Sequence, residues 1–230
     1  MTSREFHERL SRRARKANVT LTTPVVERLE AYYRLLARWN TKTNLTALQL
    51  EELTDPAVDR LLVEPLAAAR FVDDSPLVWF DLGSGGGSPA IPLKIVRPAA
   101  RLTMVESKAR KAAFLREAVR VLDLQNASVE DARFEDIAAR PSATGMAELV
   151  TVRAVKTDKV LFRASRALLR EGGRLMLFCS SGTKIPAQLG FQVFEGARLW
   201  GPGSSQIVEC VRAESSGDVS RETKGTSQTR

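Results

Sequence analysis

The chain has 230 residues, 43% of them hydrophobic and 27% charged, a balance typical of a globular protein with one substantial core and unlike that of a disordered or fibrous chain. Its formal net charge of +8 indicates an anionic partner, with nucleic acid first and a membrane surface second, although charge alone also fits a soluble protein that is merely basic. The sequence contains no apolar run of bilayer length and no apolar signal core near its start, so we expect a cytoplasmic protein.

The first 72 residues predict a helical cap. Residues 1–20 hold six cations against two acids, which indicates either a phosphate-facing surface or a solvated helix. An amphipathic helix is predicted from Thr23, with Pro24 in its first turn, and a second helical region from Pro56 to Phe71. The apolar positions that define the first of these helices are Val26, Leu29, Tyr33, Leu36 and Trp39.

Aromatic and turn-forming residues lie along and after this helix. We expect Tyr32, Tyr33 and Trp39 to be core residues in preference to platforms for base stacking. Asn40, Asn44 and Thr46, in "WNTKTNLTAL", can either order the turn or contact RNA, and we favour the structural role.

From residue 73 to 213 short apolar runs alternate with helical patterns. The runs are "LVWFDL", "LTMVES", "SVED", "LVTVRAV" and "RLMLFCS", and we expect the last helix to end at Gly172 and Gly173. This alternation predicts a doubly wound α/β core with a parallel central sheet and helices on both faces. "FQVFEG" and "QIVECVRA" predict an antiparallel pair that closes the sheet, and the polar tail 214–230 predicts disorder.

Few residues are suited to acid-base or metal chemistry. His7, the only histidine, lies in the basic N-terminal helix, so any reaction must proceed without an imidazole. Cys179 and Cys210 are far apart in apolar stretches, so we expect reduced, buried thiols and no metal site.

The stretch "FDLGSGGGSPAIPL" concentrates glycine directly after a predicted strand. Ligands of open parallel sheets bind outside the carboxyl ends of the strands, where such a loop lies. A dinucleotide fingerprint starting at Gly83 and Gly85 needs a glycine at position 88, which is Ser88, so a nucleotide-dependent oxidoreductase is disfavoured. Glycines 83, 85 and 87 after Asp81 instead have the spacing used by S-adenosylmethionine-dependent methyltransferases. The alternative interpretation is a plain flexible turn between a strand and a helix. Glu106 ends the next strand, where a carboxylate can accept both hydroxyls of a ribose.

At these residues the chain resembles a known family. "DLGSGGGSPAIPLKIVRPAARLTMVESKARKAAFLREAVRVLDLQN", "ARFED", "VTVRAV" and "WNTKTNLTAL" are similar to segments of the RsmG family, also called glucose-inhibited division protein B, from about Tyr33 to Gly173. The resemblance implies a Rossmann-like class I methyltransferase that uses S-adenosylmethionine to methylate N7 of a guanine in 16S ribosomal RNA, guanine 527 in the family. It also implies 16S rRNA or the small ribosomal subunit as partner, and we expect a monomer.

The resemblance assigns roles to individual residues. It places the glycine loop along the amino-acid and sulfonium side of the cofactor, Glu106 at the ribose, and Phe134 and Glu135 beside the adenine. Arg153 becomes a catalytic, cofactor-site or substrate-site cation, the alternative being a structural ion pair with Glu148 or Asp81. The predicted cofactor-binding residues are Asp81, Gly83, Ser84, Gly85, Gly87, Ser88, Glu106, Phe134, Glu135 and Arg153, and no metal ligand is predicted.

Some positions depart from the family pattern. Leu61, Glu64 and Pro65 replace a histidine, an aspartate and a serine, Ser88 and Ala90 alter the end of the glycine loop, and residues 179–182 read "CSSG". These departures keep open a catalytically silent relative that binds rRNA or ribosomal particles.

A basic helix follows Glu106. Its cations are compatible both with a solvated face over a buried stripe and with phosphate contacts. They are Lys108, Arg110, Lys111, Arg116 and Arg120.

Overall fold

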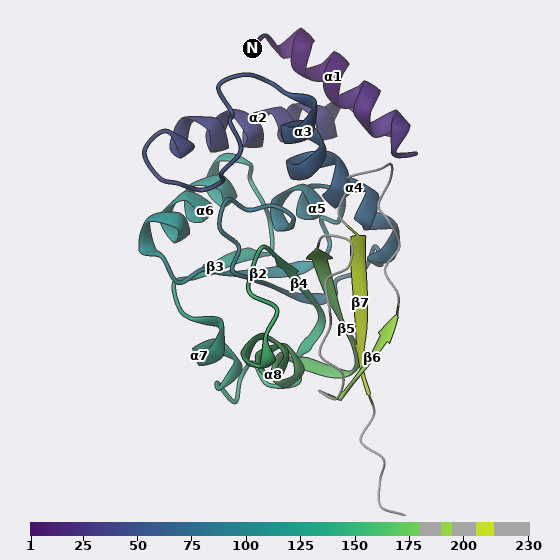
Figure 1. Cartoon of the computed structure of the whole chain (residues 1–230), viewed down its shortest axis with the longest axis vertical. Helices are drawn as coiled ribbons and strands as arrows, with labels where there is room; N and C mark the ends of the chain where they lie inside the picture. The colour runs from purple at the N-terminus through teal and green to yellow at the C-terminus, as the bar shows by residue number, and fades with distance from the viewer. Residues whose placement is uncertain (180–189, 195–205, 214–230) are drawn as a thin grey trace, which may run out of the picture.

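The computed structural model describes residues 1–179, 190–194 and 206–213, and in these ranges it forms one mixed sheet flanked by helices (Figure 1). The strand order is β3-β2-β1-β4-β5-β7-β6; β1 to β5 are parallel, and β7 runs antiparallel to both β5 and β6. The Rossmann-like α/β prediction, with its antiparallel closing strand, is therefore confirmed. The predicted disordered tail, 214–230, lies outside the described residues. The strands are β1 Val78–Leu82, β2 Arg101–Val105, β3 Ala127–Glu130, β4 Ala147–Arg153, β5 Leu169–Cys179, β6 Phe191–Phe194 and β7 Gln206–Arg212.

Helices precede the sheet and connect its strands. The predicted helix at Thr23 is confirmed as α2, which begins there with Pro24 in its first turn and ends at Asn40. None of the helices in the described ranges is long and apolar enough to cross a bilayer. The helices are α1 Ser3–Lys16, α2 Thr23–Asn40, α3 Asp55–Val58, the π-helical turn η1 Asp59–Val63, α4 Glu64–Ala68, the 3₁₀ turn η2 Ala69–Phe71, α5 Ala90–Val96, α6 Ala109–Val121, α7 Phe134–Ala138 and α8 Lys159–Leu168.

The helical cap and one face of the sheet share a single hydrophobic core. Phe6 of α1 and Tyr32 of α2 belong to the same buried cluster as Trp79 of β1. The opposite face is covered by α7 and α8, where Phe80 packs with Phe162. Because successive residues of a strand face opposite sides of the sheet, Trp79 and Phe80 belong to different cores. The cap predicted over residues 1–72 is thus packed directly on the sheet and holds a fixed position above the loop that follows β1.

Three arginines of α1 form ion pairs with other parts of the cap. Arg9, Arg12 and Arg13 donate to Asp55, and Arg13 also pairs with Asp59. Of these three arginines, Arg13 is largely buried and has a structural role that neither alternative drawn from the sequence included, whereas Arg12 remains exposed, as in a solvated helix. Together, the three side chains fasten α1 to α3 and to the π-helical turn.

Two expectations about the end of the core need correction. Helix α8 ends at Leu168, not at Gly172 and Gly173, which lie inside β5. The reason is a close backbone approach at an irregularity in the pairing of β4 with β5, since a Cβ on Gly173 would lie 2.9 Å from the Ala147 carbonyl oxygen. Cys210 is buried, as expected, but Cys179 is only half-buried.

Candidate active site

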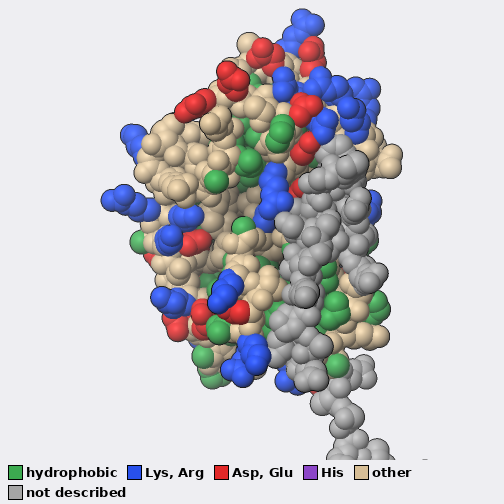
Figure 2. Space-filling model, in the orientation of Figure 1, with side chains coloured by type: hydrophobic (Ala, Val, Ile, Leu, Met, Phe, Trp, Pro, Cys, Tyr) green, Lys and Arg blue, Asp and Glu red, His purple; other side chains and the backbone are tan. Residues whose placement is uncertain are grey.

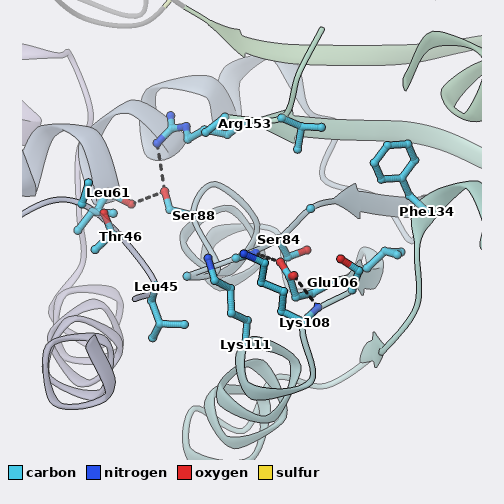
Figure 3. Close-up of a pocket in the computed structure, with 18 of the residues that line it drawn as sticks. Leu45, Thr46, Leu61, Ser84, Ser88, Glu106, Lys108, Lys111, Phe134 and Arg153 are labelled. Carbon is cyan, nitrogen blue, oxygen red and sulfur yellow. Dashed lines mark hydrogen bonds between the residues drawn. The ribbon is translucent and has the colours of Figure 1, made fainter. Parts of the chain in front are cut away.

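A cavity of about 680 Å³ lies at the carboxyl ends of the parallel strands, under the cap (Figure 3). Its walls come from the loop after β1, the residues that follow β2 and β4, and the segment between β3 and α7. The cap closes one side with the segment after α2 and with the π-helical turn. The side chains that line the cavity include Leu45, Arg60, Leu61, Ser84, Ser88, Glu106, Lys108, Lys111, Phe134, Glu135 and Arg153.

The glycine loop is held by the end of the neighbouring strand. The amides of Gly83 and Ser84 both donate to the carbonyl of Val105, at 2.9 and 3.1 Å. Gly85 has a φ of +53°, and a Cβ built there would have only the Gly83 carbonyl oxygen, 3.7 Å away, within 4 Å. At this point the bare backbone therefore faces open space in the cavity, and any larger residue would extend into that space.

Glu106 presents a fixed carboxylate beside this loop. Its residue is 7% exposed, and its two side-chain oxygens accept hydrogen bonds from the amides of Gly85 and Lys108, each at 2.9 Å. Because each carboxylate oxygen has two lone pairs, each can accept a further hydrogen bond from a ligand. A pair of adjacent hydroxyl groups, such as those of a ribose, suits this arrangement.

Phe134 and Glu135 form another part of the wall, at the start of α7. Figure 3 shows the Phe134 ring on the far side of the cavity from Leu61 and Thr46. The ring packs on the core beneath α7 and α8, which also contains Val105 and Val155. An apolar ring supported in this way can accept the flat face of an aromatic base.

Arg153 ends β4 and is almost fully buried at the cap side of the cavity. Its Nη2 donates to the carboxylate of Glu64 at 2.9 Å, and only 6% and 4% of the two side chains are exposed. Its guanidinium also lies over the Phe178 ring, 4.6 Å from the ring centre. Burial lowers the pKa of Arg153 to about 10, so the group remains a cation at neutral pH.

The sequence suggested Glu148 or Asp81 as the ion-pair partner of Arg153 in a structural role, and the structure shows Glu64 in that place. Glu148 instead accepts from Arg170 and from the Val78 amide. Glu64, the actual partner, is 89 residues away in sequence. Charge pairing alone does not reveal such a partner, because the chain offers many carboxylates at that range.

Three of the departures from the family pattern meet at Arg153. Its Nη1 donates to the Ser88 hydroxyl at 3.1 Å and to the Arg60 carbonyl, and the Ser88 hydroxyl donates to the Leu61 carbonyl at 2.9 Å. Position 61 thus contributes its backbone, position 64 retains a carboxylate, and position 88 contributes a hydroxyl. This network fastens the π-helical turn of the cap to the glycine loop.

Two of the predicted site residues, Asp81 and Gly87, do not line the cavity. Asp81 is 1% exposed and accepts from the Thr151 hydroxyl at 2.5 Å, and burial raises its pKa to about 6. A Cβ on Gly87 would lie 2.4 Å from the Ile91 side chain. The structure places both residues behind the loop, where they determine its shape. The other eight predicted residues all line the cavity.

The site also contains residues that the sequence interpretation did not assign to it. Lys108 and Lys111 line the cavity from the start of α6, and Arg60 and Leu45 line it from the cap. The Leu45 segment is shaped by Asn40, whose side-chain oxygen accepts from the amides of Leu45 and Thr46, at 2.9 and 3.0 Å. The structural role expected for Asn40 is thereby confirmed. The similarity of "WNTKTNLTAL" to a family segment was the available signal that this turn lies near the site.

The chain is similar to proteins of known name. Residues 25–185 match the family model described as rRNA small subunit methyltransferase G. The ribosomal RNA small subunit methyltransferase G of Roseiflexus sp. strain RS-1 is 38% identical over 163 residues, which cover 71% of this chain and 68% of that protein. The protein of the same name from Leuconostoc mesenteroides is 34% identical over 205 residues, which cover 85% of this chain and 83% of that one.

Solved structures support the fold. A SAM-dependent methyltransferase from Aquifex aeolicus superposes with a TM-score of 0.54 at 12% sequence identity, over 69% of this chain and 94% of that one. At that identity the likeness is one of architecture.

Proposed function

The chain belongs to the rRNA small subunit methyltransferase G family, and from that premise we propose that it transfers a methyl group from S-adenosylmethionine to N7 of a guanine in 16S rRNA, guanine 527 in the family. We further propose that it acts as a single chain in the cytoplasm. The observation on which the proposal rests is the combination, in one cavity, of open backbone at Gly85 and a buried carboxylate at Glu106 held by two amides.

We assign each part of the cofactor to one region of the cavity. The Gly85 backbone offers room for the amino-acid and sulfonium part, the Glu106 carboxylate can bind the ribose hydroxyls, and the Phe134 ring can contact the adenine. Its volume of about 680 Å³ is within the usual range for small-molecule sites. When bound, S-adenosylmethionine supplies an electrophilic methyl group on a positively charged sulfur.

The reaction requires the protein to align the two reactants and does not require it to transfer a proton. Guanine N7 is a hydrogen-bond acceptor with an exposed lone pair, so nothing has to be deprotonated before attack. Among the described residues that line the cavity there is no histidine and no cysteine, in keeping with a reaction that needs no general base or protein nucleophile. Holding the two reactants in line can supply several kcal/mol of the barrier, on the order of 7–11 in favourable cases.

Arg153 acts as a positioning residue in this scheme. Its guanidinium connects Glu64 and the Arg60 carbonyl of the cap with Ser88 of the glycine loop, and it lies over the Phe178 ring. It therefore holds the cap in register with the glycine loop, so that Leu45 and Leu61 face the cofactor's side of the cavity.

Lys108 and Lys111 add positive charge where an RNA phosphate would approach.

Transfer of label from tritiated S-adenosylmethionine to 16S rRNA or to small ribosomal subunits tests the proposal. Wild-type protein should label the RNA, whereas cofactor binding without transfer would support the catalytically silent alternative. Gly85→Val should abolish measurable cofactor binding, because its side chain would occupy the open space of the cavity.

Gly145→Val is the matched control for that variant. Gly145 also has a positive φ, +68°, and a Cβ there would meet nothing within 4 Å, but the residue does not line the cavity. Both variants therefore bear a comparable backbone strain. If the two variants bind the cofactor equally well by calorimetry, the placement of the cofactor at Gly85 is wrong.

A further inference from the structure

A second hollow, of about 510 Å³, adjoins the active-site cavity. We name it the Trp39 groove; it is lined by Arg38, Trp39, Lys42, Thr43, Arg110 and Ala113. The same two segments of the chain line both hollows, with different residues. The segment after α2 supplies Lys42 to the groove and Leu45 to the cavity, and the first turn of α6 supplies Arg110 to the groove and Lys111 to the cavity. Since consecutive helix residues point about 100° apart, the two hollows lie on adjacent faces of α6.

The cations of the Trp39 groove are not neutralised. Arg38, Lys42 and Arg110 are exposed, and within the described part of the chain their side chains form no hydrogen bond or salt bridge. Among the described residues, no carboxylate lines the groove. The pKa of Glu117 is lowered first by the hydrogen bond from Arg120 and only weakly by Arg38, so this nearby acid is already engaged. Figure 2 shows Lys and Arg side chains spaced along the left edge of this face, the side on which α6 and the end of α2 lie in Figure 1.

Trp39 differs from the other aromatic residues of its helix. Tyr32 and Tyr33 are buried, with 0% and 1% exposure, as the sequence predicted. Trp39 is half-buried: it packs edge-on against Phe114, with ring centres 5.8 Å apart, and its remaining surface lines the groove. A ring fixed by the core and surrounded by cations is the arrangement on which proteins stack bases of single-stranded nucleic acid.

The geometry of the target also requires such a surface. In an A-form RNA helix N7 lies in the deep, narrow major groove, which side chains cannot enter. A guanine that reaches the cavity must therefore be unpaired, and its neighbours in the strand then lie against the surface around the cavity, which includes the first turn of α6.

We propose that the Trp39 groove binds a nucleotide of 16S rRNA next to the target guanine. Its base would stack on Trp39, and the adjoining phosphates would contact Arg38, Lys42 and Arg110. This inference rests on the proposed function, because the cavity next to the groove is where the target base is expected to react.

The test compares two triple variants that remove the same charge. The groove variant is Arg38→Ala, Lys42→Ala and Arg110→Ala; the control is Arg4→Ala, Arg15→Ala and Lys16→Ala on α1, which are exposed and do not line either hollow. Binding of a 16S rRNA transcript is measured as a function of salt, and cofactor binding is measured by calorimetry. The groove variant should lose at least tenfold in RNA affinity, and the slope of log K against log salt should become shallower by about 2, near 0.7 for each of the three lost phosphate contacts.

The control variant should keep its RNA affinity within about threefold, and both variants should bind the cofactor as wild type does. Equal losses in the two variants would mean that only the overall charge matters, and would overturn the proposal. Loss of methyl transfer with unchanged RNA binding in the groove variant would overturn it as well. If wild-type protein binds RNA through the groove but transfers no methyl group, the proposed function fails, and with it the assignment of the bound nucleotide as the neighbour of a target guanine, while RNA binding by the groove stands.

Trp39 is tested separately, because its truncation also removes packing against Phe114. Trp39→Phe should retain most of the RNA affinity, and Trp39→Leu should lose about tenfold, since it fills the core but has no ring. If both variants bind RNA like wild type and differ only in thermal stability, Trp39 is a core residue and the stacking assignment is wrong.

Discussion

Two basic regions of this molecule look alike in the sequence and differ in the structure. On α1, the arginines at positions 9, 12 and 13 are ion-paired with Asp55 and Asp59, which are about 45 residues away along the chain. In the Trp39 groove, Arg38, Lys42 and Arg110 have no ion-pair partner in the described ranges. Positive charge is therefore used to assemble the cap in the first region and is left available to a ligand in the second.

The difference shows that uncompensated charge is more informative than total charge. An ion pair that is satisfied within the fold gains little by binding a phosphate, because its cation must first give up its carboxylate. A cation without a partner loses nothing and releases counterions when RNA binds. The predictions that follow extend this comparison to other charged groups of the chain, in order of expected effect on stability.

The largest effect is expected at the most deeply buried pair. Glu64→Ala leaves the Arg153 guanidinium buried without a counter-charge, and it should lower the free energy of unfolding by about 3–5 kcal/mol. Glu130→Ala is the control, since its pair with Arg140 is 40–46% exposed and should change stability by less than about 1 kcal/mol. Urea denaturation of the two variants measures both values, and a similar small loss in each would refute the role assigned to the buried pair.

A smaller effect is expected where α1 meets the π-helical turn. The side chains of Arg13 and Asp59 are 14% and 18% exposed, so Arg13→Ala should cost about 1–2 kcal/mol, between the values for exposed and for buried pairs. Arg4→Ala, on the same helix but highly exposed, should leave the denaturation midpoint unchanged. Loss of RNA affinity in Arg13→Ala at temperatures where it is folded would contradict the view that these arginines are structural.

Asp81 represents a third arrangement, a buried carboxylate with a hydroxyl partner in place of a cation. Burial raises its pKa to about 6 from an ordinary value near 3.8. Above pH 6 it is ionised in both the folded and the unfolded state, so the cost of burying the charge is fully present; as the pH falls through 6 the folded state takes up a proton and that cost is relieved. Between pH 7 and pH 5 the stability of wild type should therefore rise by about 1 kcal/mol relative to Asp81→Asn. A difference between the two proteins that does not change with pH would show that Asp81 does not titrate in this range.

The smallest effect on stability is expected in the Trp39 groove itself. Arg110→Ala removes an exposed side chain that has no hydrogen-bond partner in the described structure, so the free energy of unfolding should change by less than about 0.5 kcal/mol. The same variant should bind 16S rRNA several-fold more weakly. A clear loss of stability would place Arg110 with the structural arginines of α1 and remove the contrast between the two regions.

Features set by short stretches of sequence were predictable. The helix from Thr23, the glycine loop and the position of Glu106 each follow from the spacing of a few neighbouring residues, and each is found where the pattern places it. Even over a short stretch of sequence, a glycine pair fits more than one local structure. Gly172 and Gly173 resemble the end of a helix, but they lie in a strand because β4 and β5 approach closely there.

Features that join distant segments were not predictable from one sequence. Three such features depend on how the cap packs on the sheet: the partner of Arg153, the ion pairs of α1 and the two walls of the Trp39 groove. The burial of Asp81 has the same origin. As Trp79 and Asp81 both face the cap side of β1, the aspartate is buried beneath the cap and does not line the cavity.

The central claim is that this cavity delivers a methyl group to guanine N7, and chemical mapping of the modified nucleotide tests it most directly. 16S rRNA is isolated from cells with and without this protein, treated to cleave the strand at 7-methylguanine, and analysed along its whole length. The account predicts one cleavage that depends on the protein, absent in cells that contain only the Gly85→Val variant and present with Gly145→Val. Identical cleavage patterns with and without the protein, or a methyl group on an atom other than N7, would contradict it.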